Sequence, residues 1–102
     1  MPTSSLDVEQ LRHNATEAVA LLRTLAHEDR LLLICQLSQM EMCVSELETT
    51  LGILQPSLSQ QLGVLRREGL VTTRREGKHI YYKVIPGPAL KLVKLLHKIY
   101  CP

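Results

Sequence analysis

The stretch Gln55–Tyr82, QPSLSQQLGVLRREGLVTTRREGKHIYY, constrains the fold more than any other part of the chain, because its periodicity changes from helical to extended partway along. Its first half has leucines at the spacing of one buried helix face: Leu58, Leu62 and Leu65. We expect Pro56 at the first helical position and Gly69 at the end of the helix. Two alternating segments, LVTTRR and HIYYKVI, then flank EGK, which predicts a tight hairpin with a basic tip.

The rest of the chain is predicted to be helical. Apolar residues recur at helical spacing over residues 5–24, 27–39, 45–52 and 87–100. Ser45 and Glu48 are expected to form a capping box at the start of the short third helix. The sequence therefore predicts one mainly α domain over residues 1–102 with a small β-hairpin (ααααββα), in which a helix-turn-helix is followed by a wing.

The outward face of the helix after Pro56 carries small and amide side chains, whereas an ordinary solvated face would carry Glu and Lys. Amides and hydroxyls are the groups that a helix in the major groove of DNA directs at base edges. We expect Gln60 and Gln61 to pair with adenine edges. Ser57 and Ser59 are suited to bases or phosphates, and the basic side chains to phosphates. The full set of predicted DNA-binding residues is Gln55, Ser57, Ser59, Gln60, Gln61, Arg66, Arg67, Arg74, Arg75, Lys78 and His79.

Charge is distributed unevenly along the chain. Residues 1–48 hold eight acidic and three basic residues, whereas residues 66–98 hold nine basic and two acidic ones. The second half is therefore suited to a polyanion, most simply double-stranded DNA. The alternative interpretation of this charge distribution is an ordinary solvated surface of mixed charge. The alternative to DNA binding is a winged helix that makes protein contacts.

No apolar run approaches the roughly 20 residues of a membrane-spanning helix. The first residues, MPTSSLDVEQ, lack the pattern of a signal peptide. We therefore expect a cytoplasmic protein that does not contact membranes, whose three cysteines are reduced thiols, ligands or redox sensors. There is no Cys-x-x-Cys pair, Gly-rich loop or other catalytic motif, so neither enzymatic activity, catalytic residues nor a cofactor is expected.

Two segments of the chain resemble the ArsR family of dimeric winged-helix repressors. LLRTLAHEDRLLLI resembles the family's second-helix signature, and Gln55–Tyr82 resembles its recognition helix and wing. Family members commonly carry Pro where this chain has Glu28. The resemblance runs from about Ala18 to Cys101 and implies a homodimer, built on the first and last helices, that binds an inverted repeat. The two recognition helices would lie about 34 Å apart, one turn of DNA.

The metal sites of the family are matched poorly. Its arsenic- and cadmium-type site resembles ELCVCDL, whereas this chain reads EMCVSEL, so Cys43 matches the first thiolate and Ser45 replaces the second. Soft metals and arsenite prefer two or three thiolates together. The family's other site needs carboxylates and histidines on the last helix, which here offers only His97. No metal is therefore expected, with a metalloid response through Cys43 and another cysteine as the alternative.

The remaining two cysteines match a different branch of the family. LLLICQL, with Cys35, and IYCP, with Cys101, resemble the BigR/SqrR-like branch, whose members sense persulfide and polysulfide through such a pair. The resemblance implies that Cys35 and Cys101 are the redox-sensing thiols, that reactive sulfur species are the inducer, and that a bridge between the thiols releases the operator. Cys35 alone is more simply interpreted as a small core residue. HlyU-like regulators share the pattern, so an antirepressor is an alternative to a repressor.

Overall fold

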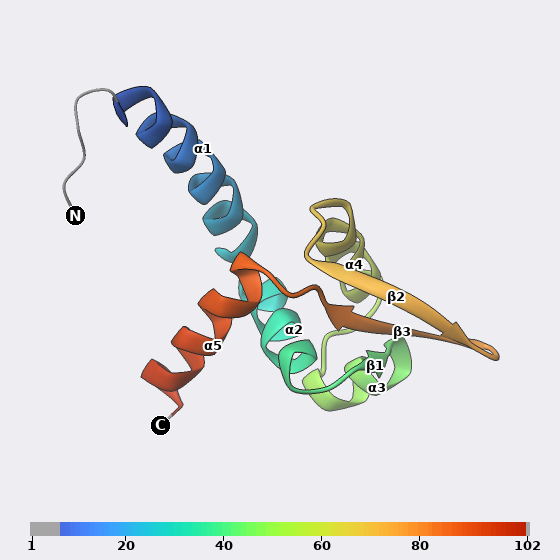
Figure 1. The fold of residues 1–102 in the computed structure, drawn as a ribbon. Helices are drawn as coiled ribbons and strands as arrows, with labels where there is room; N and C mark the ends of the chain where they lie inside the picture. The colour runs from blue at the N-terminus through green and yellow to red at the C-terminus, as the bar shows by residue number, and fades with distance from the viewer. Residues whose placement is uncertain (1–6, 102) are drawn as a thin grey trace.

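The computed structural model of the chain describes residues 7–101 and shows a group of helices from which a long hairpin projects (Figure 1). The five expected helices and the hairpin are all present, so the predicted mainly α fold is confirmed. The first residues of the helix predicted over residues 5–24 lie outside the described part. In chain order the elements are α1 Val8–Leu25, α2 Glu28–Gln39, β1 Met42–Cys43, α3 Val44–Leu51, α4 Ser57–Arg67, β2 Val71–Glu76, β3 His79–Val84 and α5 Pro88–Tyr100.

The hairpin belongs to a three-stranded antiparallel sheet with the strand order β1-β3-β2. Strands β2 and β3 pair from Val71 opposite Val84 to Glu76 opposite His79. Gly77, at a φ of +63°, supplies the left-handed turn conformation that L side chains rarely adopt. The two-residue strand β1 was not predicted, because so short a segment has no periodicity to detect.

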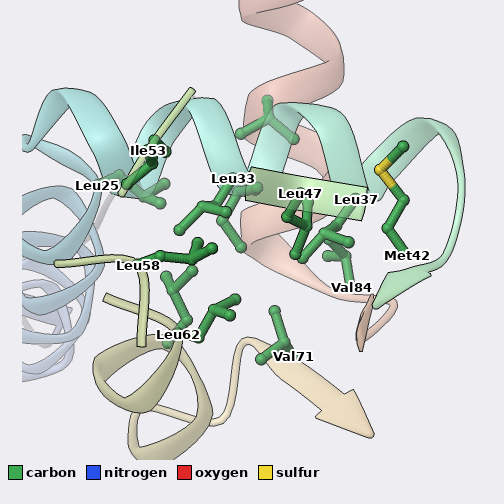
Figure 2. Close-up of a cluster of buried hydrophobic side chains, with 13 residues drawn as sticks. Leu25, Leu33, Leu37, Met42, Leu47, Ile53, Leu58, Leu62, Val71 and Val84 are labelled. Atoms are coloured by element: carbon green, nitrogen blue, oxygen red, sulfur yellow. The ribbon is translucent and has the colours of Figure 1, made fainter. Parts of the chain in front are cut away.

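The core lies where α2, α3 and α4 meet the base of the hairpin (Figure 2). The predicted leucine stripe of α4 is confirmed, since Leu58, Leu62 and Leu65 are all buried. They pack with Leu33 of α2 and Leu47 of α3, which are fully buried. Each such side chain contributes about 1.5–3 kcal/mol by leaving water. This packing fixes α4 with its other face outward.

Two helices keep apolar faces that their own chain does not cover. In Figure 1, α1 projects from the body, and only its last residues, Thr24 and Leu25, are buried. The exposed apolar side chains of α1 and α5 are Val8, Leu11, Val19, Leu22, Leu95, Ile99 and Tyr100. No helix in the described part of the chain is long and apolar enough to cross a membrane.

The cap of α3 differs from the prediction. The capping box is formed by Cys43 and Glu46, whose carboxylate accepts a hydrogen bond from the Cys43 N–H at 3.0 Å. The helix starts earlier than expected because pairing of β1 with β3 leaves Cys43 as the last extended residue, with φ −91° and ψ 170°. Ser45 therefore lies inside the helix, where its hydroxyl is 3.3 Å from the Cys43 sulfur. The predicted end at Gly52, with φ +70°, is confirmed.

Candidate functional site

Helix α4 presents a polar outer face above its buried leucines. Ser59, Gln60, Arg66 and Arg67 are exposed, and Ser57 is half-buried. Pro56 lies at the N-cap, one residue before the position predicted for it. The Gln55 side chain accepts a hydrogen bond from the Ser59 N–H at 3.1 Å. Gln55, predicted to contact DNA, therefore satisfies one of the open N–H groups at the start of the helix.

The two glutamines of α4 have different surroundings. Gln60 is exposed, whereas Gln61 is half-buried. The Gln61 side-chain oxygen accepts a hydrogen bond from Nε of Arg30, in the first turn of α2, at 2.8 Å. The structure therefore leaves Gln60 facing outward and turns Gln61 toward α2.

One basic residue in the middle of the wing, on β2 opposite Tyr81, is bonded to carboxylates. Arg74 pairs with Glu41 at 2.8 Å and with Glu76 at 3.2 Å, and its guanidinium lies 4.7 Å from the ring centre of Tyr81. The hydrogen bond from Arg74, assisted by its charge, holds the pKa of Glu41 below its usual range. Arg74, predicted to contact phosphate, thus holds β2 to the segment before β1.

Three further basic residues of the wing, Arg75, Lys78 and His79, are exposed near its tip. Arg75 donates a hydrogen bond to the carbonyl oxygen of Gly77 at 3.3 Å. Lys78 and His79 follow in the turn and the first position of β3, and the His79 ring lies edge-on to Tyr81. These side chains form a basic end to the hairpin that projects from the body (Figure 1).

Cys35 and Cys101 lie on two helices that pack side by side. Cys35 is half-buried on α2, and Cys101 is exposed immediately after α5. Figure 1 shows α2 and α5 next to each other. Burial raises the pKa of the Cys35 thiol, and the charge of a Cys101 thiolate raises it further. Because α2 and α5 pack against each other, the fold places these two thiols, which are far apart in the sequence, on neighbouring elements.

Cys43 is separate from this pair. It is buried where β1 meets α3, and Figure 1 shows that junction at the opposite end of the body from the carboxyl terminus. Its sulfur faces the Ser45 hydroxyl. Within residues 7–101, no group of three or more His, Cys, Asp or Glu side chains is arranged to hold a metal ion.

Three residues that position the site were not predicted: Arg30, Glu41 and Tyr81. Arg30 bonds a residue 31 positions away, and Glu41 bonds one 33 positions away. Sequence periodicity reports only near neighbours, so no local pattern could have indicated these pairs.

An outward polar helix fixed by a helix-turn-helix, followed by a basic wing, defines a winged helix-turn-helix DNA-binding protein. The chain belongs to the arsR family: residues 27–73 match the family described as "Bacterial regulatory protein, arsR family". As a member of a family of regulators, it is not an enzyme.

Named relatives cover most of the chain. The biofilm growth-associated repressor of Agrobacterium fabrum is 52% identical over 91 residues, 89% of this chain and 78% of that protein. The transcriptional activator HlyU of Vibrio cholerae is 38% identical over 96 residues, 94% of this chain and 89% of that protein.

Solved structures show the same fold. The transcriptional repressor BigR from Xylella fastidiosa superposes with a TM-score of 0.85 at 48% identity, covering 91% of this chain and 92% of that chain. Reduced HlyU from Vibrio cholerae has a TM-score of 0.89 at 38% identity and covers 93% of this chain and 100% of that chain.

Proposed function

We propose that the protein is a cytoplasmic transcriptional repressor that binds an operator as a homodimer and releases it when reactive sulfur species bridge Cys35 and Cys101. The observation that carries the proposal is the packing of α5 against α2, which places Cys101, at the end of α5, on the element beside the helix that holds Cys35. Similarity to the repressors of Agrobacterium fabrum and Xylella fastidiosa supports the assignment of repression.

DNA binding would use the exposed face of α4 and the basic end of the wing. Gln60 and Ser59 are exposed where a helix in the major groove meets base edges. Arg66, Arg67 and Lys78 are exposed and suited to phosphates. The exposed apolar faces of α1 and α5 are available for a second copy of the chain, which would place two recognition helices on an inverted repeat.

The thiol chemistry would begin at Cys101, because Cys101 is exposed whereas burial keeps Cys35 protonated. The Cys101 thiolate attacks the sulfane sulfur of a low-molecular-weight persulfide, RSSH; the S–S bond breaks, RS⁻ leaves and Cys101 becomes a persulfide. Cys35 then loses its proton and attacks Sγ of Cys101, the inner sulfur of the persulfide. The bond from Sγ to the outer sulfur breaks, a disulfide forms and HS⁻ leaves. The two thiols lose two electrons, which the sulfane sulfur gains. If a second RSSH first converts Cys35 to a persulfide with loss of RS⁻, the outer sulfur of that persulfide attacks Sγ of Cys101, HS⁻ leaves and a three-sulfur bridge forms.

A bridge would tie the end of α5 to α2, against which α4 packs. Because α5 is also a proposed dimer helix, the bridge would link the dimer scaffold to the DNA-reading unit. A small shift of α4 relative to its partner in the dimer would then weaken the operator complex.

An operator gel shift before and after polysulfide treatment tests the proposal, with a duplex enriched from genomic fragments by the wild-type protein. The wild type is expected to release DNA, and Cys101→Ser is expected to stay bound. Cys43→Ser is the matched control, because it makes the same substitution at a thiol outside the pair, and it should release DNA like the wild type. Equal release by Cys101→Ser and the wild type would contradict the proposal.

A second candidate is an antirepressor, because similarity to the transcriptional activator HlyU spans 94% of this chain. Such a protein would bind DNA but raise transcription only by displacing another DNA-bound protein. In vitro transcription with RNA polymerase alone separates the two. A repressor lowers transcript yield, whereas an antirepressor changes it only when the template is silenced by a second protein.

A metalloid response through Cys43 is the remaining alternative. Its thiol caps α3, so a ligand there would compete with the capping box. Titration of the operator complex with arsenite, for the wild type and for Cys43→Ser, tests whether Cys43 senses a metalloid. Release that disappears in the variant would support metalloid sensing, and release unchanged by the substitution would remove it.

A further inference from the structure

One guanidinium joins three helices at the back of the recognition helix. Arg30, half-buried in the first turn of α2, donates from Nε to the Gln61 side-chain oxygen at 2.8 Å. It also donates from Nη1 to the carbonyl oxygen of Thr24 at 3.3 Å. Thr24 is buried in the last turn of α1, and its hydroxyl bonds the Ala20 carbonyl at 3.1 Å. Arg30 thus connects the end of α1, the start of α2 and the middle of α4.

The orientation of these groups has a consequence for the neighbouring glutamine. Successive residues on an α-helix are about 100° apart, so Gln60 and Gln61 cannot both face DNA squarely. Gln61 is half-buried and bonded toward α2, whereas Gln60 is exposed. The bond to Arg30 holds the Gln61 oxygen on the α2 side of the helix, whereas a bidentate contact with adenine needs both the oxygen and the nitrogen of the amide on the outer face.

We propose that Arg30 and Gln61 are a positioning pair: Gln61 does not read a base, and the bond to Arg30 sets the angle at which α4 presents Gln60 and Ser59 to DNA. The planar guanidinium suits this role because it donates in two fixed directions, to α4 and to α1. The inference rests on the proposed binding of DNA through α4.

The test uses Arg30→Met, Gln61→Met and the double variant. Methionine has the length of glutamine and replaces the aliphatic part of arginine, but it cannot form the hydrogen bond. The probe is a 30-bp duplex (about three turns of DNA) selected from a random library by the wild-type protein, together with every single-base-pair change of it. Affinities are measured by fluorescence anisotropy well below each variant's melting temperature. Arg23→Met is the matched control, because it removes the same charge from an exposed position in the last turn of α1.

Each single variant is expected to bind about tenfold more weakly, the size expected for loss of a hydrogen bond to a charged group. The double variant should be no weaker than either single one, because both remove the same bond. Each variant should lose affinity by the same factor for every duplex in the panel, so that its preference among bases is unchanged. Arg30→Lys should recover part of the affinity, and Arg23→Met should bind like the wild type.

Three results would overturn the inference. The first is a loss of preference at one base pair of each half-site in Gln61→Met but not in Arg30→Met, which would make Gln61 a base reader. The second is a double variant in which the two losses of affinity add. The third is a set of variants that melt at lower temperature yet bind DNA like the wild type, which would make the contact only stabilising. If Arg30→Met does not fold, the affinities of Gln61→Met for the panel of duplexes still show whether Gln61 reads a base. A wild type that enriches no duplex would instead contradict the proposed function, and the inference with it.

Discussion

Cys35 and Cys101 differ in exposure, which is one of the properties that govern thiol reactivity. Cys101 is exposed, whereas burial, and then the charge of Cys101, raise the pKa of Cys35. A raised thiol pKa means that the folded state favours the neutral form. Its stabilising effect is therefore present below the ordinary thiol pKa of about 8.5 and is lost as pH rises through the higher folded value.

This difference predicts the order of alkylation in the reduced protein. Iodoacetamide at neutral pH should modify Cys101 first, and the rate at Cys35 should rise only at a pH above the ordinary thiol range, because the thiolate is the nucleophile. Peptide mass spectrometry over a pH series measures both rates. Modification of Cys35 at neutral pH as fast as Cys101 would show that its thiol is not held in the neutral form.

Cys43 has a structural role that its substitutions can reveal. Serine is among the best N-cap residues, so Cys43→Ser should retain the α3 cap, whereas Cys43→Ala should cost about 1 kcal/mol of stability. Urea denaturation of the two variants measures the difference. Equal stability of the serine and alanine variants would mean that the capping box observed at Cys43 and Glu46 contributes nothing.

At the scale of elements, the parts of the fold with a regular period were predictable and the contacts between distant elements were not. The leucine stripe ending at Leu65 predicted α4 because helical spacing is visible in the sequence. The cap of α3 was misplaced, because the pairing that makes Cys43 extended involves Tyr81, far along the chain. The pairing of Cys35 with Cys101 was expected from family resemblance alone. Periodicity cannot place two segments beside each other.

Two substitutions in the wing distinguish a residue that holds the wing in place from one that contacts DNA. Arg74 is tied to Glu41 and Glu76, whereas Lys78 is exposed in the turn. Lys78→Gln should reduce the log–log salt slope of DNA binding by about two for a dimer, since each protomer loses one phosphate contact. Arg74→Gln should weaken binding with little change in slope, because the wing loses its anchor. An equal loss of slope in both variants would make Arg74 a phosphate contact, as the sequence alone suggested.

At the scale of the whole molecule, the uncovered apolar faces of α1 and α5 account for the proposed homodimer. Leu22 of α1 is 53% exposed in the single chain. Leu22→Glu should raise the dimer dissociation constant by roughly 100-fold or more, because each dimer would lose two buried leucines worth about 1.5–3 kcal/mol each. Sedimentation equilibrium measures this. Met40→Glu is the control, since Met40 is 54% exposed at the end of α2, outside both faces. A Leu22→Glu protein as dimeric as the control would contradict this dimer.

The central claim is that a covalent link between two thiols that are far apart in the sequence weakens binding to operator DNA. One titration tests it most directly: polysulfide is added to the protein bound to a fluorescent operator duplex, and each sample is read by anisotropy and then by mass spectrometry of its tryptic peptides. The account predicts that the fraction of released DNA follows the fraction of peptide in which Cys35 is joined to Cys101. Full release with the two cysteines unjoined, or full joining with DNA still bound, would contradict it.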